Sequence, residues 1–265
     1  MYKIAISDLD GTLLNPMHKV STTTKQAVDS WKKADKEFVI ATGRHYIEAK
    51  RIQEDLGEPI YLITSNGARV HDPKGNIMLK QNLPTEIATT ICNYDFDPSV
   101  QINLFTDHNW YANFSRQELK DMCIDTDFFC QECDLKSIDK SNTIKIFFYG
   151  EREKLDIIYK ILNEQFAGKV NLTFSLDMCL EVMEANTNKG AAVNAVLKEM
   201  NLTEAQAIAF GDGMNDVEML KSVGKPILMK NSQNDLLNAL PEAEITLSSR
   251  DDGVAVKLNK LLQSL

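Results

Sequence analysis

Four short stretches of this chain carry side chains suited to holding a metal ion and a phosphoryl group. They are "DLDGTLL" from Asp8, "ATGR" from Ala41, "NKG" from Asn188 and "GDGMND" from Gly211. Their acidic groups have no His or Cys among them, and an all-oxygen ligand set favours a hard cation such as Mg²⁺. The hydroxyl, backbone N–H and ammonium groups of the same stretches are donors for phosphoryl oxygens.

The first of these stretches places two carboxylates on either side of Leu9. Side chains alternate in extended chain, so we expect Asp8 and Asp10 to point the same way. Gly11 then allows the backbone to turn sharply and approach a ligand closely. Two carboxylates at about 4 Å repel by roughly 4 kcal/mol at an effective dielectric near 20. A cation is therefore expected in the same pocket.

Alternating strands and helices are expected to bring the four stretches together. Apolar runs predict strands at 2–7, 38–41, 60–64, 207–211 and 226–229, and helical periodicity predicts helices at 24–34, 47–56, 193–200, 217–221 and 254–262. Ligands bind beyond the carboxyl ends of the strands in an open parallel sheet. Asp8, Thr42 and Asp212 end three of the strands, so we expect them at one edge. Lys189, placed just before the Val193 helix, is expected to lean over that edge.

The middle of the chain breaks the alternation. Turn signals at Asn66-Gly67 and Gly75-Asn76 predict hairpins, and a boundary is expected near Leu83-Pro84. Mixed helices and strands follow, at 85–93, 101–105, 110–113, 118–126, 144–149, 155–166, 170–175 and 180–183. We therefore expect a discontinuous core of residues 1–83 and 186–265, with an inserted α+β domain at 84–185.

Composition limits the class of protein. With 265 residues, 43% hydrophobic and 25% charged, the chain is expected to fold as a core domain plus a second, smaller one. A net charge of −9 disfavours a nucleic-acid surface and favours small-molecule chemistry. No apolar run reaches membrane-spanning length and no secretory leader is evident, so a cytoplasmic enzyme without a membrane partner is expected.

Five cysteines form an odd set without a disulfide pattern, which indicates reduced thiols. Cys130 and Cys133 make one CxxC. A zinc or redox role for this pair stays an alternative, but no second pair lies nearby, and two small residues in a variable segment are the simpler interpretation.

The four stretches, in this order, resemble the four motifs of the haloacid dehalogenase superfamily of phosphohydrolases. "TSNGA" from Thr64, "DDGVA" from Asp251 and the insert between the second and third motifs are similar to the Cof-type group, subfamily IIB. This resemblance implies an α/β fold: a Rossmann-like three-layer α/β/α core with a parallel sheet, plus an inserted C2-type cap that selects the substrate. Within the group, the chain most resembles bacterial sugar-phosphate and pyridoxal-phosphate phosphatases.

The resemblance also implies a role for each matching residue. Asp8 would attack phosphorus and form an aspartyl-phosphate, while Asp10 would protonate the leaving alcohol and then activate water. Mg²⁺ would be held by Asp8, the backbone carbonyl of Asp10, and Asp212. Asp216 would orient Lys189 or a metal-bound water. The phosphate would be gripped by the backbone of Leu9 and Gly43, and by Thr42, Lys189 and Asn215.

These roles describe a Mg²⁺-dependent phosphomonoesterase that acts on small phosphorylated metabolites, with no nucleic acid and no obligate protein partner. Two alternatives stay open. One is a phosphomutase, which would return the phosphoryl group to its substrate. The other is a non-enzymatic phospho-acceptor switch, which the large insert and Asp10 disfavour. "LMKNSQ" from Leu228 departs from the Gly-Asn-Ala run of many relatives and leaves the shape of that loop open.

Overall fold

The computed structural model describes residues 1–121 and 128–264. These form two compact units: Met1–Lys80 together with Asn188–Leu265, and Gln81–Thr187. The domain boundaries expected from the sequence lie close to these positions, between residues 83 and 84 and between residues 185 and 186.

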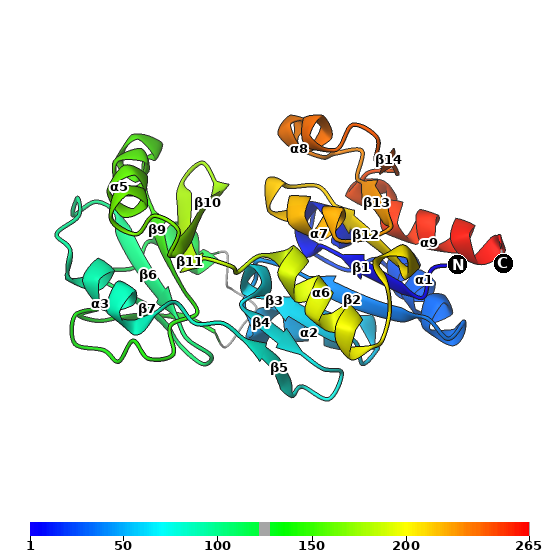
Figure 1. Ribbon diagram of the computed structural model, residues 1–265, viewed down its shortest axis with the longest axis horizontal. Helices are drawn as coiled ribbons and strands as arrows, with labels where there is room; N and C mark the ends of the chain where they lie inside the picture. Colours follow the sequence, from blue (N-terminus) through cyan, green and yellow to red (C-terminus); the bar gives the residue numbers. More distant parts are fainter. Residues whose placement is uncertain (122–127, 265) are drawn as a thin grey trace. The chain divides into compact units, whose positions relative to one another are not determined.

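The first unit is built on an eight-stranded sheet (Figure 1). In sheet order the strands are β14 (Glu244–Ile245), β13 (Lys225–Leu228), β12 (Ala207–Gly211), β1 (Ile4–Ser7), β2 (Glu37–Ala41), β3 (Tyr61–Thr64), β4 (Arg69–His71) and β5 (Ile77–Lys80). The strands from β14 to β3 pair in parallel, as crossover helices between them require. β4 and β5 pair antiparallel, as the two turn signals predicted.

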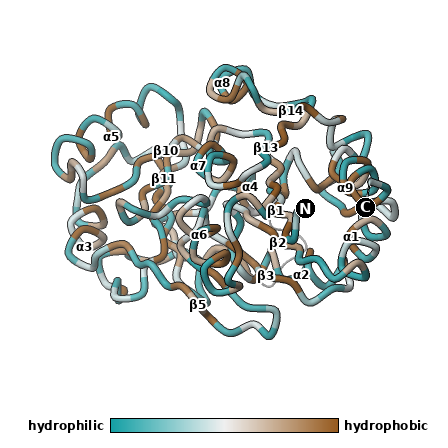
Figure 2. The backbone as a smooth tube through the Cα atoms, turned by 45° about the vertical axis from the view of Figure 1, so that its right-hand side comes forward, coloured by the Kyte–Doolittle hydropathy of each residue, from teal (hydrophilic) through white to brown (hydrophobic). Residues whose placement is uncertain are grey.

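Helices cover both faces of this sheet. One apolar cluster joins the sheet to α1 (Thr22–Lys33), α2 (Tyr46–Leu56) and α9 (Gly253–Gln263), and a second joins it to α6 (Lys189–Glu199), α7 (Val217–Lys221) and α8 (Asn234–Ala239). The inner strands are largely hydrophobic in Figure 2 because neither of their faces meets water. The three-layer α/β/α core expected from the sequence is confirmed.

Side-chain caps fix where these helices begin. Ser21 accepts a hydrogen bond from the backbone N–H of Thr24 at 3.0 Å, and so starts α1 at Thr22, two residues before the start expected from periodicity. Asn188 accepts one from the N–H of Ala191 at 2.8 Å and starts α6. The expectation that Lys189 precedes its helix was therefore wrong. Lys189 is the first residue of α6, because Asn188 supplies the cap that apolar periodicity does not reveal.

The second unit has a six-stranded sheet with helices on one face. In sheet order its strands are β10 (Val170–Leu176), β11 (Cys179–Glu184), β9 (Lys145–Tyr149), β6 (Gln101–Phe105), β7 (Trp110–Ala112) and β8 (Cys130–Glu132). α3 (Thr85–Asn93) and α5 (Arg152–Gln165) pack their apolar sides on this sheet. α4 (Gln117–Asp121) is the described part of the helix expected at 118–126, whose remainder lies outside the described residues. The α+β character expected of the insert is present.

Among the strands and α-helices of the described residues, β8, β14 and α8 were not predicted. β8 contains one member of the CxxC pair. Cys133 is a free thiol, and burial raises its pKa, which disfavours the reactive thiolate. Cys123 lies outside the described residues. Within the described ranges, the one group of acidic, His or Cys side chains close enough to share a metal ion lies elsewhere, in the first unit.

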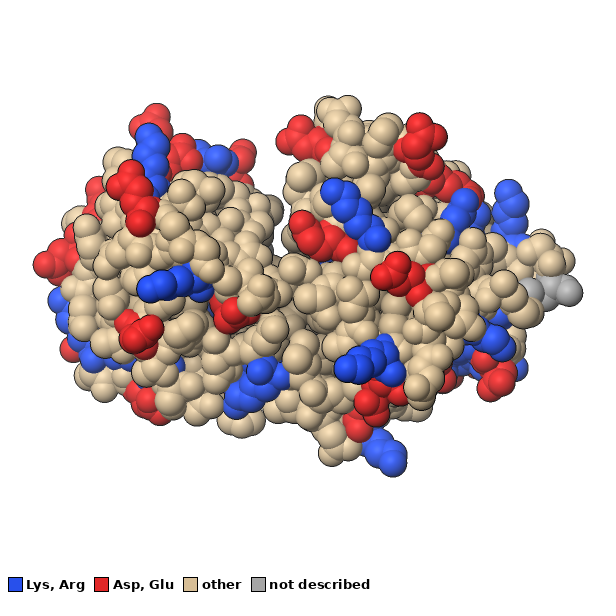
Figure 3. All heavy atoms as spheres, in the orientation of Figure 1, with Lys and Arg blue, Asp and Glu red and all other residues tan. Residues whose placement is uncertain are grey.

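The surface seen in Figure 3 carries charged side chains of both signs rather than a predominance of basic ones. On the face shown in Figure 3, acidic and basic side chains are interspersed over both units. None of the helices in the described part of the chain combines the length and the apolar character that crossing a bilayer requires.

Candidate active site

Three neighbouring strands end in polar residues at one edge of the first sheet. β1 pairs with β12 on one side and with β2 on the other. Asp8 follows β1, Thr42 follows β2, and Asp212 follows β12. Asp8 is 6% exposed and Thr42 is 1% exposed, so both residues are buried. The convergence that parallel topology predicted is the arrangement found.

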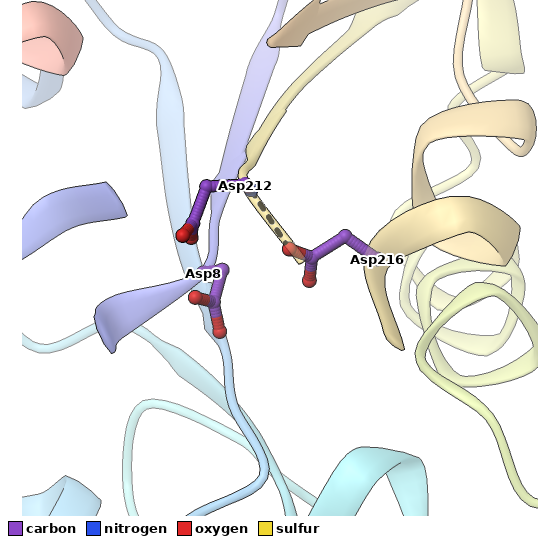
Figure 4. Close-up of side chains that lie close together, drawn as sticks. All are labelled: Asp8, Asp212 and Asp216. Atoms are coloured by element: carbon purple, nitrogen blue, oxygen red, sulfur yellow. Dashed lines mark hydrogen bonds between the residues drawn. The ribbon is translucent and has the colours of Figure 1, made fainter. Parts of the chain in front are cut away.

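Three carboxylates form a cluster at this edge. Asp8, Asp212 and Asp216 each offer an oxygen atom, and these atoms lie within 4.8 Å of one another (Figure 4). The backbone N–H groups of Asp212 and Gly213 donate to Asp216 Oδ2 at 3.0 and 3.1 Å. Asp216 is thereby fixed against the start of its own loop, while the other two carboxylates face it from β1 and β12.

Lys189 supplies the positive charge of this cluster. Its side chain is fully buried, and Nζ donates to Asp8 Oδ1 and to Asp216 Oδ1, both at 2.6 Å. Burial alone would lower the pKa of Lys189, but the carboxylates of Asp216 and Asp8 more than offset this and hold its pKa above 10.5. Lys189 therefore stays an ammonium ion and orients two carboxylates at once.

One lysine does not balance three carboxylates. Burial raises the pKa of Asp8 well above its usual value of 3.8, against the opposing effect of Lys189. Burial also raises the pKa of Asp212 to about 6, with the charge of Asp216 adding to the rise. The raised pKa values mean that burial disfavours the ionised forms by more than Lys189 stabilises them. The three carboxylates have only one ammonium group beside them. Their oxygen atoms therefore fit a divalent cation that prefers oxygen ligands.

Thr12 holds Asp212 in place. Its hydroxyl, on a side chain 1% exposed, donates to Asp212 Oδ1 at 2.7 Å. Gly11 lies so close to the same carboxylate that an added Cβ would be 2.2 Å from Asp212 Oδ2, and its φ of +77° suits glycine. Thr12 stood in the quoted motif, but nothing in its spacing indicated a bond to a residue 200 positions away.

Asp10 has partners of its own. Arg44 Nε donates to Asp10 Oδ2 at 2.7 Å and Arg44 Nη2 to Asp10 Oδ1 at 2.6 Å, while His18 Nδ1 lies 3.1 Å from Oδ1. Burial alone would raise the pKa of Asp10, but the hydrogen bonds and charge of Arg44 bring it below 3.8. Asp10 is therefore ionised in this arrangement. The sequence indicated Asp10 but gave no role to Arg44 or His18.

The other residues expected to bind phosphate follow three neighbouring strands: Leu9 follows β1, Thr42 and Gly43 follow β2, and Asn215 follows β12. The Thr42 hydroxyl accepts a hydrogen bond from the N–H of Arg44 at 3.1 Å, which turns the chain through Gly43. Asn215 Nδ2 donates to Asn66 Oδ1 at 3.2 Å. Leu9 is buried behind Asp8, with its side chain in the apolar cluster that contains α1 and α9. The sequence gave Asn66 no chemical role.

The stretch "LMKNSQ", which departs from the Gly-Asn-Ala run of many relatives, supports the two loops that carry the acidic residues, after β1 and after β12. Asn231 Nδ2 donates to the carbonyl of Gly11 at 2.7 Å, and its Oδ1 accepts from the N–H of Ser249 at 2.9 Å. The N–H of Gln233 donates to the carbonyl of Asp212 at 2.9 Å. Its side chains therefore support the loops on which the cluster stands.

Comparison with known proteins adds independent information. Residues 5–258 match the family of haloacid dehalogenase-like hydrolases. A proposed phosphatase of Buchnera aphidicola is 36% identical over an alignment of 265 positions, which covers 98% of this chain and 98% of that protein. The HMP-PP phosphatase of Serratia proteamaculans is 34% identical over 100% of this chain and 97% of its own length. A solved haloacid dehalogenase-like hydrolase of B. subtilis has a TM-score of 0.85 at 26% identity, over 97% of this chain and 99% of that one.

Proposed function

The chain belongs to the haloacid dehalogenase-like hydrolase family and is a phosphatase, and we propose that it hydrolyses small phosphomonoesters through an aspartyl-phosphate on Asp8 with the aid of Mg²⁺. The observation that carries the proposal is the setting of Asp8. It is buried at the end of the central strand β1, with Lys189 Nζ 2.6 Å from its Oδ1. A buried carboxylate held by one ammonium has a fixed direction, which nucleophilic attack requires.

In the first step, an oxygen of Asp8 attacks phosphorus, and the bond between phosphorus and the leaving oxygen breaks. Lys189 already holds Asp8 Oδ1 at 2.6 Å, so Oδ2 is the oxygen with the freer approach to the substrate. Lys189 also compensates negative charge on the phosphoryl oxygens as the group is transferred. The Thr42 hydroxyl, the N–H groups of Leu9 and Gly43, and the Asn215 amide supply the neutral donors.

Asp10 moves the protons. It donates a proton to the leaving alcohol, and the resulting carboxylate then takes a proton from the water that hydrolyses the aspartyl-phosphate. Arg44 holds Asp10 as a carboxylate through two hydrogen bonds. Asp10 must therefore leave Arg44 and take up a proton from solvent before it acts as an acid toward the substrate. The ion pair keeps this carboxylate beside the site until a substrate competes for it.

The residues that would hold Mg²⁺ are Asp8, the backbone carbonyl of Asp10, and Asp212. When bound, Mg²⁺ supplies positive charge to the phosphoryl oxygens and to Asp8. Asp216 would not be a ligand, because Lys189 occupies its Oδ1 and two backbone N–H groups occupy its Oδ2. Asp216 instead holds Lys189 and the turn after Asp212 in position.

For the substrate we propose a small phosphorylated metabolite, with sugar phosphates, pyridoxal phosphate and HMP-PP as the first compounds to assay. The name of the Serratia relative supports the last of these. We further propose that the second unit, Gln81–Thr187, is a cap that selects among them. A cytoplasmic location, and the lack of a nucleic-acid or obligate protein partner, stay predictions.

The direct test uses Asp8→Asn, which keeps the size of the side chain and removes the nucleophile. With p-nitrophenyl phosphate and Mg²⁺, wild type should release nitrophenol and inorganic phosphate in equal amounts, and Asp8→Asn should fall to background. Asp29→Asn, on the exposed side of α1, is the matched control and should keep wild-type activity. An active Asp8→Asn enzyme would reject the nucleophile. With a sugar phosphate as substrate, formation of an isomer without inorganic phosphate would indicate a phosphomutase.

A further inference from the structure

The turn formed by residues 65–67, directly after β3, is tied to the loop expected to bind phosphate. The backbone N–H of Asn66 donates to the carbonyl of Thr42 at 2.9 Å. The N–H of Ser65 donates to the carbonyl of Arg44 at 2.8 Å. The two segments therefore move together, although they follow different strands.

The side chain of Asn66 contacts two of the groups proposed to hold phosphate. Its Oδ1 accepts the hydrogen bond from Asn215 Nδ2 at 3.2 Å. The same Oδ1 lies 3.0 Å from the position that a Cβ on Gly43 would occupy. Asn66 is 5% exposed, so its amide is enclosed between these neighbours.

Gly67, at the other end of the turn, lies against the start of α6. A Cβ on Gly67 would lie 2.3 Å from the carbonyl oxygen of Asn188, the residue that caps this helix. The next residue is Lys189, which binds Asp8. One three-residue turn thus touches the segments that present Gly43, Asn215 and Lys189.

This turn has an unfavourable local conformation. Ser65 and Asn66 have φ of +48° and +53°, in the left-handed region, which asparagine tolerates but serine rarely adopts. Within the part of the chain that the structure describes, the buried hydroxyls of Thr64 and Ser65 have no hydrogen-bond partner. Such costs persist where the surrounding structure fixes the conformation, and they concentrate at functional sites.

We infer that Asn66 is a positioning residue for the transferred phosphoryl group, which orients the Asn215 amide and braces the Gly43 backbone. The inference rests on the proposed function, because both neighbours are groups proposed to hold phosphate. An asparagine amide nitrogen carries two hydrogens. Donation of one to Asn66 sets the plane of the Asn215 amide and leaves the second hydrogen for a phosphoryl oxygen.

The test separates the amide of Asn66 from its backbone conformation. Asn66→Gly removes the side chain and keeps a residue that tolerates a φ of +53°. We expect kcat/KM for p-nitrophenyl phosphate to fall about fivefold and the inhibition constant of inorganic phosphate to rise by a similar factor, as the loss of one hydrogen bond implies. Asn201→Gly is the matched control: its φ is +54° after the end of α6, and its kinetics should stay those of wild type.

A double-mutant cycle tests whether Asn66 acts through Asn215. In the Asn215→Ala background, Asn66→Gly should change kcat/KM by less than about twofold, because the hydrogen bond is already absent. Equal effects of Asn66→Gly in both backgrounds would overturn the positioning role through Asn215. Wild-type kinetics in Asn66→Gly would overturn the inference altogether.

Gly43→Ala provides a second measurement. Its new Cβ would press on Asn66 Oδ1, so kcat/KM should fall, and adding Asn66→Gly should restore part of the loss. No restoration would contradict the bracing contact. If Asn66→Gly does not fold, Asn66→Asp keeps the shape and the acceptor oxygen. Its added charge should weaken inhibition by inorganic phosphate, and an unchanged constant would overturn the inference.

These outcomes are separable from failure of the proposed function. Asp8→Asn reports on the nucleophile without involving Asn66. An active Asp8→Asn enzyme would remove the premise. An inactive Asp8→Asn enzyme combined with wild-type behaviour of Asn66→Gly would remove the present inference alone.

Discussion

Lys189 is the residue whose removal should disturb the site most. Its buried ammonium group lies 2.6 Å from Asp8 and 2.6 Å from Asp216, and it holds both carboxylates. Lys189→Met keeps the length and apolar character of the side chain and deletes its charge. The substitution leaves Asp8, Asp212 and Asp216 facing one another without their ammonium group.

The magnitude follows from two opposing effects. Each attraction is worth about 4 kcal/mol at 4 Å and an effective dielectric near 20, and both are lost. The variant recovers the several kcal/mol that burying an ammonium ion costs. Removing one partner of a buried pair costs roughly 3–5 kcal/mol in net terms, and we expect a loss of this size in the free energy of unfolding. Adding Asp216→Asn should recover part of it, since one unpaired charge disappears.

The chain offers a clean optical assay for this unit. Its two tryptophans lie in different units, Trp31 in α1 and Trp110 in β7. In a Trp110→Phe background, the buried Trp31 reports urea unfolding of the unit that contains Lys189. Unfolding curves at pH 7 without Mg²⁺ give the free energies of the parent, Lys189→Met and the double variant with Asp216→Asn.

Lys257→Met is the matched control for Lys189→Met. Lys257 is 7% exposed and binds Glu244, but Glu244 is 35% exposed in its side chain and also binds Lys225 at 2.9 Å. We therefore expect a loss of about 1 kcal/mol or less there. A loss below 1 kcal/mol for Lys189→Met itself, or an Asp216→Asn addition that worsens it, would refute the electrostatic account of the cluster.

Three further predictions test the supports around the site. Thr12→Val removes the hydroxyl that donates to Asp212 Oδ1 and keeps its shape, so the Mg²⁺ concentration for half-maximal activity should rise about tenfold; an unchanged value would contradict the orienting role. Gly11→Ala places a Cβ against Asp212 Oδ2 and strains a φ of +77°, so phosphatase activity should be lost while the far-ultraviolet circular dichroism stays that of wild type; an active variant would show that the loop can yield. Burial alone would raise the pKa of Glu244, but its two lysine partners hold that pKa below 4.5. The ionised Glu244 therefore stabilises the fold above pH 4.5, and this contribution is lost as the pH falls through the pKa of the folded state. Glu244→Gln should thus lower the Tm at pH 7 by more than at pH 4, and a constant difference would speak against it.

The core of this fold could be predicted because its signals are local. The cap at Ser21, the periodicity that follows and the apolar runs of β1 and β12 each depend on residues close in sequence. Parallel topology then requires Asp8 and Asp212 to meet at one edge. Elements with weak local signals were missed: β14 has two residues and α8 has six, too few for a hydrophobic period to stand out.

The contacts that complete the site could not be predicted, because they join side chains distant in sequence. Thr12 reaches Asp212, Arg44 reaches Asp10, and Asn66 reaches Asn215. No periodicity or turn signal describes such pairs, which depend on how loops pack after the strands are in place. Sequence spacing indicated which residues to propose for the chemistry, and the structure adds which side chains contact them.

The two neighbouring carboxylates of the first motif have different partners. Asp8 is bound to the buried Lys189, which has no route to solvent, whereas Asp10 is bound to Arg44, 26% exposed in its side chain, and to the exposed His18. A fixed, enclosed counter-ion suits a group that must keep one direction for attack, and Lys189 opposes the rise that burial causes in the pKa of Asp8. A more accessible counter-ion suits a group that must change partners and gain or lose a proton. The difference between the two cations therefore supports assigning attack to Asp8 and proton transfer to Asp10, rather than the reverse.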